Sequence, residues 1–556
     1  MRTYFTWIDW TVLAAYFAAT MGIGFYFYRR TRTTEGFTTG NRSLPGWACG
    51  LSIFGTYVSS ISFLALPGKA YTTNWNSFVF NLSLPISTWA AVRYFLPYYR
   101  RSGEVSAYAH LEHRFGPWAR MYASAFYLLT QLARIGAVTY LMALPLSVLL
   151  GWDIRTIILV TGISVTVYAF VGGIVAVIWA DAMQSIVLVV GAIICSVIIM
   201  LGMPDGPGQV FSIAAANHKF SLGSFGLSLA EPTFWVVFLY GLTMNLQNFA
   251  IDQNYVQRYI ASRSDREARK SVWLGGLLYL PVAAVFFCIG TSLFAYYQVH
   301  PAAMEEVRTA VAAQSLQAEG LDPAANPDVL AARRDSLSQA QIGDKVFPHF
   351  IGASLPPGVT GLVIAAIFAA AMSTVSTSLN SSATLLMRDY YQRYVNRSAS
   401  ERQSMAVLYG ATVLWGLLGT GLALLLVHVT SALDAWWVLS GIFGGGMVGL
   451  FLLGMISKRV GNPAAITSVC LGIGGILWMT LSQYFGGRWA LLRSPFHAFM
   501  IPVVGTLTIL LVGLLVGRLT ASRKGVASSG HADTVVEKTG TRWNRGQPDG
   551  DRPFLR

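Results

Sequence analysis

Apolar stretches long enough to cross a lipid bilayer recur along almost the whole chain of 556 residues. A helix needs roughly 20 apolar residues to span the hydrocarbon layer. Runs of about this length lie at 8–28, 47–66, 76–98, 121–150, 155–173, 175–201, 232–255, 272–298, 357–387, 405–428, 433–456, 464–485 and 497–518. The pattern therefore predicts an all-α integral membrane protein with about 13 transmembrane helices. The first run is longer and more aromatic than a cleaved signal peptide, so we expect it to be retained.

The composition agrees with this prediction, because 54% of the residues are hydrophobic and only 12% are charged. The net charge of +14 would suit a nucleic-acid partner, but its distribution indicates topology instead. Basic residues gather in alternate loops, as Arg29, Arg30, Arg32, Arg42, Arg100, Arg101, Arg114, Arg120, Arg258, Arg263, Arg266, Arg269, Lys270, Arg388, Arg393, Arg397, Arg402, Lys458 and Arg459. Cytoplasmic loops carry such an excess. We therefore expect a multi-pass protein of the cell membrane with its N-terminus outside and its C-terminus in the cytoplasm, and no nucleic-acid partner.

One helical face at 370–384 is polar although it lies within a predicted span. Ser373, Ser376, Thr377, Asn380 and Thr384 have the spacing of one side of a helix. We call these residues the hydroxyl face. Uncharged oxygens of this kind can replace the water shell of a cation, but hydroxyls also join helices to one another in membranes. The spacing alone leaves both interpretations open.

Two other predicted spans are interrupted by polar residues near the middle of the membrane. In the run 47–66, Ser59, Ser60 and Ser62 follow closely after Gly55. In the run 232–255, the inner half carries Asn245, Gln247, Asn248, Asp252, Gln253 and Asn254. A helix broken at this depth can offer backbone carbonyls to a cation. Because the two runs lie five spans apart, they predict two five-helix inverted repeats that share a central site.

The same patterns predict how the chain is divided. The segments are an extra N-terminal helix with a cytoplasmic loop (1–46), the first repeat with core helices 1–5 (47–201), an outer loop (202–231), the second repeat with core helices 6–10 (232–456), C-terminal helices (457–518) and a disordered cytoplasmic tail (519–556). The second repeat includes a long polar outer loop at 299–356, which we expect to be partly helical.

Charged residues inside the predicted spans are costly and often functional. Asp181 is either a functional carboxylate or an interfacial charge, since it lies near the inner boundary. Arg134 is deeper, and it either pairs with an acidic residue or binds an anionic substrate. Asp252 lies close to the inner end of its span, where it serves a gate or only ends a helix.

Several motifs, in the right order, resemble those of the sodium:solute symporter family, which includes the sodium/glucose cotransporters. They are TEGFTTGNRSLPGWACGLS at 34–52, VIWADAMQ at 177–184, DQNYVQR at 252–258, MSTVSTSLNSS at 372–382 and FLLGMISKR at 451–459. The likeness covers about residues 8–518. It implies the LeuT-type core of two five-helix inverted repeats, with one extra N-terminal helix and two or more C-terminal helices.

The resemblance also implies sodium sites. At the first site, Gly55, Val58 and Ala370 would supply backbone carbonyls, and Ser373 and Thr374 would supply hydroxyls. Members similar to the sialic-acid transporters have a second site, whose elements match Asp181, Ser376 and Thr377. The family pattern thus implies one sodium ion, and two if the second site binds.

The substrate positions depart from the sugar transporters. Ile61 and Ser62 replace a Glu-Gln pair, Asn81 replaces an acidic residue, and Trp437 replaces a glutamine. These changes put glucose and galactose in doubt. Ser59, Ser62, Asn81 and Arg134 instead resemble the sialic-acid branch, in which the arginine holds a carboxylate. Residues that would form a gate or the pocket wall are Asp252, Gln253, Tyr255 and Trp437.

The sequence therefore predicts a secondary active transporter that imports a small organic solute with sodium, and not an enzyme. The expected solute is a carboxylate-bearing sugar such as sialic acid. The alternatives are a neutral glucose- or galactose-like sugar and a monocarboxylate. The expected partners are the solute, sodium ions and the lipid bilayer, and the oligomeric state stays open.

Overall fold

The structure, a computed structural model, describes residues 5–27, 32–150, 152–427, 439–442 and 444–529. These residues form helices and no β-strand. The longest helices are α1 (Trp7–Phe27), α9 (Pro117–Leu150), α10 (Ile154–Leu201), α12 (Phe234–Ile251), α14 (Asp265–Val299), α18 (Val359–Leu385), α19 (Glu401–Leu426), α22 (Asn462–Leu481) and α23 (Met500–Ser529). The prediction of an all-α membrane protein is confirmed.

Within the described part of the chain, ten helices are long and apolar enough to cross a membrane. The number is eleven if α3 (Gly46–Tyr57) and α4 (Ser60–Thr72), which are bent at a break, form one span. The predicted number of about 13 is therefore not confirmed. The two runs that account for the difference are 76–98 and 155–173.

The run 76–98 is a chain of short helices. It contains α5 (Val79–Leu82), α6 (Leu84–Ala90), a π-helix (Ala91–Phe95) and the start of α7 (Leu96–Ser102). Pro85 and Pro97 each lie in the first turn of a new helix, since proline lacks the N–H that would continue the preceding one. The backbone stays right-handed helical at the junctions, so the hydrogen-bonding pattern changes without a break, and hydropathy cannot show this.

The runs 155–173 and 175–201 form the single element α10, which bends between them. Gly173 at the bend has a φ of 52°, which favours glycine. A Cβ atom at this position would lie 2.8 Å from the ring of Phe37. The N-terminal part, at 154–170, is apolar but shorter than the other candidate spans.

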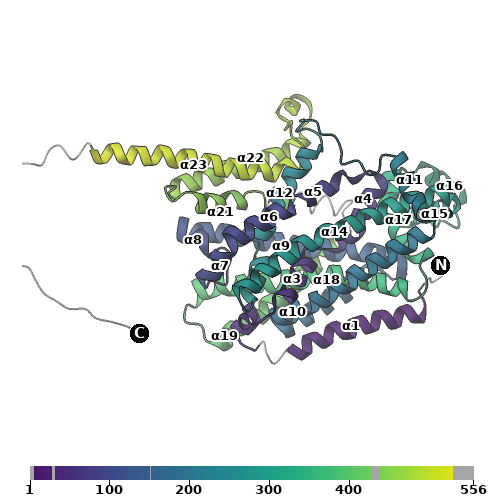
Figure 1. Cartoon of the computed structure of the whole chain (residues 1–556), viewed down its shortest axis with the longest axis horizontal. Coiled ribbons are helices and arrows are strands. Elements are labelled where there is room, and N and C mark those ends of the chain that lie inside the picture. Colours follow the sequence, from purple (N-terminus) through teal and green to yellow (C-terminus); the bar gives the residue numbers. More distant parts are fainter. Residues whose placement is uncertain (1–4, 28–31, 151, 428–438, 443, 530–556) are drawn as a thin grey trace, which may run out of the picture.

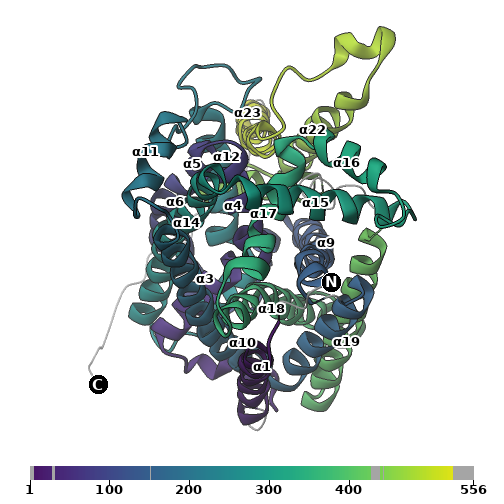
Figure 2. The same ribbon diagram turned by 90° about the vertical axis from the view of Figure 1, so that its right-hand side faces the viewer.

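α18 lies at the centre of the molecule, and nearly all of its residues are buried. It packs against α10, and α14 packs against α3 (Figure 1). α1 lies on one side of this centre, whereas α22 and α23 lie on the opposite side (Figures 1 and 2). The hydroxyl face is therefore enclosed by protein and does not contact lipid.

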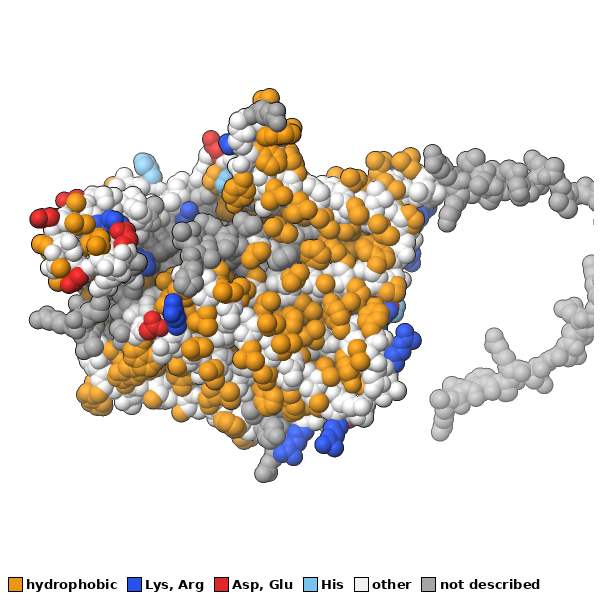
Figure 3. Space-filling model, turned by 180° about the vertical axis from the view of Figure 1, so that it is seen from behind, with side chains coloured by type: hydrophobic (Ala, Val, Ile, Leu, Met, Phe, Trp, Pro, Cys, Tyr) orange, Lys and Arg blue, Asp and Glu red, His pale blue; other side chains and the backbone are white. Residues whose placement is uncertain are grey.

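The predicted outer loop 299–356 is mostly helical, as α15 (Pro301–Ala318), α16 (Pro327–Ser336) and α17 (Gln339–Ser354). Figure 3 shows a broad hydrophobic surface between an end with Lys and Arg side chains and an opposite end where Asp and Glu side chains gather. We call the first the basic end. α23 continues to Ser529, past the boundary predicted at 518, and the rest of the predicted tail lies outside the described residues.

Candidate functional site

The first core helix is broken where the sequence predicted. α3 ends at Tyr57, α4 begins at Ser60, and the two halves are bent by 53°. Val58 and Ser59 between them have extended backbone. The Ser59 hydroxyl accepts a hydrogen bond from the Ser62 amide (3.4 Å) and so caps α4. The break frees carbonyls at the end of α3 from the helical pattern.

All five residues predicted for the first sodium site meet at this break. Ser373 Oγ on α18 donates to the carbonyl of Gly55 (2.8 Å) and contacts that of Ala370 (3.3 Å). Thr374 Oγ1 contacts the carbonyls of Val58 (3.4 Å) and Ala370 (3.1 Å). Three carbonyl and two hydroxyl oxygens thus converge. Such uncharged oxygens suit a monovalent cation, because they replace its hydration shell without binding it too tightly.

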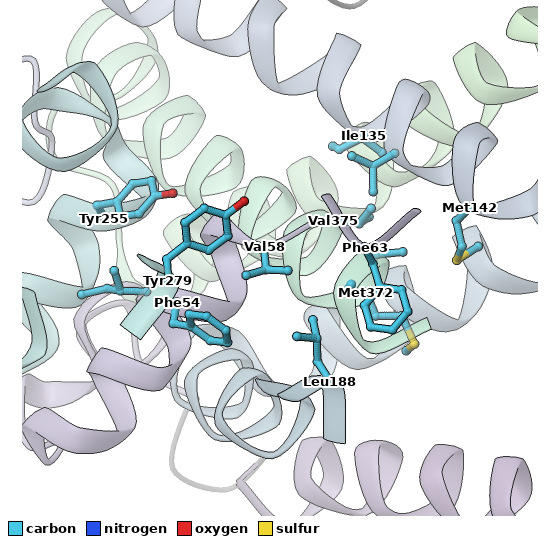
Figure 4. Packing of buried hydrophobic residues seen from close by; sticks show 14 of the residues in the cluster. Phe54, Val58, Phe63, Ile135, Met142, Leu188, Tyr255, Tyr279, Met372 and Val375 are labelled. Atoms are coloured by element: carbon cyan, nitrogen blue, oxygen red, sulfur yellow. The ribbon is translucent and has the colours of Figure 1, made fainter. Parts of the chain in front are cut away.

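The surroundings of this cluster are tight and mostly apolar. A Cβ atom on Gly55 would lie 2.6 Å from Ser185 Oγ, so the glycine allows α3 to approach α10 closely. Figure 4 shows Val58 among buried side chains from several helices, namely Phe63, Ile135, Met142, Leu188, Tyr255, Tyr279, Met372 and Val375. Few other polar groups can solvate an ion in such a place, so these oxygens act on it strongly.

A second polar cluster surrounds Asp181, which is fully buried. Its Oδ2 atom accepts hydrogen bonds from Ser52 Oγ (2.6 Å) and from Arg258 Nη2 (2.8 Å), and Thr377 Oγ1 lies 3.4 Å away. Asp181 is therefore not an interfacial charge. Both side chains of the Asp181–Arg258 ion pair have no exposed surface.

The assignment of Arg258 to a cytoplasmic loop is thus wrong. Arg258 belongs to α13 (Gln253–Ala261), which turns it into the protein core. Counting basic residues could not find this, because a buried and a solvated arginine look alike in sequence. The only signal was the motif at 252–258, which matched the end of a helix.

The predicted second sodium site is only partly assembled. Thr377 is beside Asp181, but Ser376 Oγ donates to the Ser373 carbonyl (3.2 Å). Asp181 Oδ1 is buried, and no hydrogen-bond partner for it lies among the described residues. That oxygen is an acceptor that a cation could satisfy, so the chemistry of the site is compatible with a second ion.

Arg134 reaches the same break from α9. Its Nη2 donates to the carbonyl of Thr56 (2.9 Å) at the end of α3. No carboxylate in the described part of the chain forms an ion pair with it, although Asp252 lies within electrostatic reach. Of the two interpretations left open for Arg134, a structural ion pair is therefore not supported. The other N–H groups of the Arg134 guanidinium can donate hydrogen bonds to another acceptor.

Asp252 lies between α12 and α13 and caps α13 by accepting a hydrogen bond from the Asn254 amide (2.8 Å). This confirms that Asp252 ends a helix, and that the second interrupted span is broken. Gln253 bonds to the backbone of Ala107 (2.7 Å) and Val105 (2.9 Å). A role of Asp252, Gln253 or Tyr255 in a gate stays a prediction.

The far end of the hydroxyl face joins helices, as the second interpretation of this face predicted. Gln257 Nε2 on α13 donates to Asn380 Oδ1 (2.9 Å) and Thr384 Oγ1 (3.0 Å). Asn81 is buried on α5, but no hydrogen bond within the described residues joins it to Arg134, Ser59 or Ser62. Trp437 lies outside the described residues.

Two broken helices that face a polar, buried helix inside an all-α membrane protein define an ion-coupled transporter. Comparison with known proteins identifies which kind. The profile of the sodium:solute symporter family matches residues 37–472. The chain belongs to this family, so it is a sodium-coupled membrane transporter and not an enzyme.

Individual relatives agree. The chain is 32% identical to the sodium/sialic acid symporter NanT of Aliivibrio fischeri, over 91% of this chain and 92% of that one. It is also 32% identical to the sodium/sialic acid symporter SiaT of Proteus mirabilis, over 94% and 97%. A solved structure of a Na⁺-coupled sialic acid symporter, substrate-bound and outward-open, superposes with a TM-score of 0.80 at 30% identity, covering 92% of this chain and 98% of that one. The fold is therefore the LeuT-like fold of these symporters.

Proposed function

We propose that this protein imports a carboxylate-bearing sugar of the sialic acid class together with sodium. The observation that carries the proposal is Arg134, a guanidinium without an ion-pair partner among the described residues that lies against the broken helix. Arginine can bind a carboxylate through two parallel hydrogen bonds. The names of the relatives support the same substrate class.

Sodium and solute binding are coupled through the break between α3 and α4. A sodium ion among the oxygens of Gly55, Val58, Ala370, Ser373 and Thr374 ties α18 to this break. The Thr56 carbonyl that Arg134 contacts belongs to the same turn as Gly55. Ion binding therefore orders the turn against which Arg134 and the solute lie. By thermodynamic linkage, the solute strengthens sodium binding to the same extent.

A second sodium ion binds at Asp181, Thr377 and Ser376. In the structure, the Arg258 guanidinium donates a hydrogen bond to Asp181 Oδ2, and Oδ1 is free to bind an ion. Ser376 would turn its hydroxyl from the Ser373 carbonyl toward that ion. Arg258 neutralises the carboxylate when the ion has left. This lowers the free-energy cost of a buried Asp181 charge in the ion-free protein.

The membrane arrangement extends this proposal. The chain segments at 154–170 and 75–102 also cross the bilayer, which gives about 13 crossings, and 47–201 and 232–456 form the two inverted repeats. The basic end faces the cytoplasm, with the N-terminus outside. The gathering of Lys and Arg side chains at one end supports this orientation (Figure 3).

Uptake by purified protein in proteoliposomes tests the function. We expect a sodium gradient to drive accumulation of sialic acid more effectively than that of a neutral hexose or a simple monocarboxylate. Arg134→Ala removes one partner of a buried charge pair, which costs about 2–5 kcal/mol, and should reduce sialic acid uptake at least about 30-fold. Arg134→Lys keeps the charge and should recover part of the loss.

The loss caused by Arg134→Ala should be much smaller for a neutral analogue in which the carboxylate is an amide. Equal losses for the acid and the amide would overturn the role of Arg134. Sialic acid accumulation in the complete absence of sodium would overturn sodium coupling.

A further inference from the structure

A hollow of about 1020 Å³ opens at the basic end, away from the sodium sites. Its walls come from the π-helix Ala91–Phe95, α7, α8 (Ala109–Phe115), the start of α14 and the end of α21 (Met447–Ile456). α7 and α8 lie side by side at this end of the molecule (Figure 1). Nothing in the transport mechanism uses this hollow.

The lining is strongly basic, and no Asp or Glu is among the described residues that form it. Its cations are Arg93, Arg101, Arg114, Arg269 and Lys458. Arg114 is fixed by a hydrogen bond from Nε to the Gly454 carbonyl (3.0 Å). The other four form no ion pair with any carboxylate in the described part of the chain. The usual interpretation of such charges is a solvated surface, but here they line a concave space without counter-charges.

Aromatic residues place the hollow at the level of the lipid headgroups. Trp89 and Tyr94 on its rim are each 50% exposed, and the Arg93 guanidinium lies 5.5 Å from the ring centre of Tyr94. Half-exposed Trp and Tyr are typical of the membrane interface, where one end of the ring is apolar and the other is wet. One side of the hollow therefore faces acyl chains and the other faces water.

The hollow also contains an unused hydrogen-bonding atom. His110 Nε2 is buried, and no partner for it lies among the described residues. The imidazole lies beside Gly454, where a Cβ atom would come within 3.3 Å of Nε2. The structure places this histidine in the basic lining.

We propose that this hollow binds the headgroup of an anionic phospholipid. The phosphate diester would lie among Arg93, Arg269 and Lys458, and the acyl chains would run past Trp89 along the outside of α6. Basic pockets between transmembrane helices on the cytoplasmic side bind anionic headgroups in this way. The lipid would join core helix 2 to α14 and α21, in addition to the ion pair between Arg100 on α7 and Asp265 on α14 (2.8 Å). Only the choice of the inner leaflet rests on the proposed orientation.

Native mass spectrometry of the full-length protein, released from nanodiscs that contain equal amounts of phosphatidylglycerol and phosphatidylcholine, tests the proposal. We expect the wild type to retain phosphatidylglycerol preferentially. Each of Arg93→Gln, Arg269→Gln and Lys458→Gln should weaken that preference about fivefold, since one basic side chain near the headgroups contributes about that factor. Arg263→Gln and Arg402→Gln remove exposed cations that do not line the hollow and should leave the preference unchanged.

Melting temperatures of the same variants in the two lipids provide the second measurement. Phosphatidylglycerol should raise the melting temperature of the wild type and of the control variants. It should not raise that of the triple variant, which combines Arg93→Gln, Arg269→Gln and Lys458→Gln. Equal retention of both lipids by the wild type, or an unchanged preference in the triple variant, would overturn the proposal. So would an equal stabilisation by inorganic phosphate or glycerol phosphate in pure phosphatidylcholine, because the ligand would then be a free anion.

Discussion

The hydroxyls of Ser373 and Thr374 have a specific position that their neighbours on α18 lack. Each contacts carbonyls of two chain segments, one on α18 itself and one at the break after α3. Ser382 on the same helix is also buried, but its Oγ has no hydrogen-bond partner among the described residues. The comparison separates a hydroxyl that joins two elements from one that only fills space.

Ser373→Ala with Thr374→Ala should therefore abolish sodium-driven uptake. Each lost hydroxyl removes one ion ligand, which costs about 1–3 kcal/mol and so about 5- to 150-fold in sodium affinity. The measurement is uptake against sodium concentration, and Ser382→Ala is the matched control that should behave like the wild type. Sodium-driven accumulation that survives in the double variant would show that the ion binds elsewhere.

Sequence alone could predict the oxygens of the first site but not the counter-ion of Asp181. Ser373 follows from helical spacing and from the family motif, and Thr374 follows from the family motif alone; both signals are local in sequence. The Asp181–Arg258 pair joins residues 77 positions apart. Whether Arg258 is buried depends on how α13 packs. The positions of basic residues in the sequence give no information about that packing. That Arg134 has no ion-pair partner among the described residues also became visible only in three dimensions.

At the scale of elements, the break between α3 and α4 depends on how closely α3 approaches α10. Gly55→Ala would place a Cβ atom 2.6 Å from Ser185 Oγ and 3.3 Å from the Asp181 carbonyl. We expect the sodium concentration for half-maximal uptake to rise, because α3 must shift and take the Gly55 carbonyl with it. Overpacking of this kind costs about 1–3 kcal/mol.

A second substitution tests that the effect is steric. Ser185→Ala removes the atom that the new Cβ would meet, together with the hydrogen bond that Ser185 Oγ donates to the Leu51 carbonyl (2.8 Å). Gly55→Ala combined with Ser185→Ala should therefore bind sodium better than Gly55→Ala alone. A double variant with a larger loss than the sum of the two single variants would contradict this explanation.

Breaks in helices were predictable only where polar residues mark them. The breaks after Tyr57 and at Asp252 follow clusters of Ser or Asn and Gln inside apolar runs, and both were predicted. The changes of helical hydrogen-bonding pattern at 76–98 accompany Pro85 and Pro97, which alter the backbone pattern but not the hydropathy. The bend at Gly173 lies at the boundary between the predicted runs 155–173 and 175–201, but the hydropathy pattern did not indicate that the two runs form one bent helix. A hydropathy pattern therefore predicts the positions of membrane spans more reliably than it predicts their bends and breaks.

At the scale of the whole molecule, an ion-pair network closes the basic end. Glu112 on α8 accepts hydrogen bonds from Arg120 Nη1 on α9 (3.0 Å) and from Arg393 on the π-helix Leu386–Val395 that continues α18. Arg120 also pairs with Asp389. The network thus ties the end of α18 to α8 and α9.

Acid should weaken this network. Burial by itself would raise the pKa of Glu112, but the hydrogen bonds from Arg120 and Arg393 outweigh it and lower the pKa below its ordinary value of 4.5. A lowered pKa contributes stability that is present above pH 4.5 and is lost as the pH falls through the folded-state value. The melting temperature of the wild type should thus fall more between pH 6 and pH 4 than that of Glu112→Gln. Glu231→Gln removes an exposed carboxylate that forms no ion pair with any described residue and should keep the wild-type slope.

The number of sodium ions per cycle decides whether the membrane potential drives transport. Each inward sodium gains about 2.3 kcal/mol per 100 mV, and a carboxylate solute loses the same amount. With two ions and one carboxylate, one net charge moves inward, so 100 mV should raise sialic acid accumulation about 50-fold at equal sodium concentrations. A potassium gradient with valinomycin supplies that potential in proteoliposomes. With one ion, the potential should have no effect.

Substitutions at the second sodium site should convert transport that responds to the membrane potential into transport that does not. Asp181→Asn removes the ligand carboxylate but leaves Arg258 as an unpaired buried charge, which is destabilising by about 3–5 kcal/mol. Asp181→Asn with Arg258→Gln removes both charges and should fold better, while it still binds the first sodium ion. We expect this double variant to take up sialic acid in a sodium gradient and to be insensitive to the potential. A double variant that keeps the full response to the potential would show that the second ion does not bind at Asp181, and a wild type without any response would show that there is no second ion.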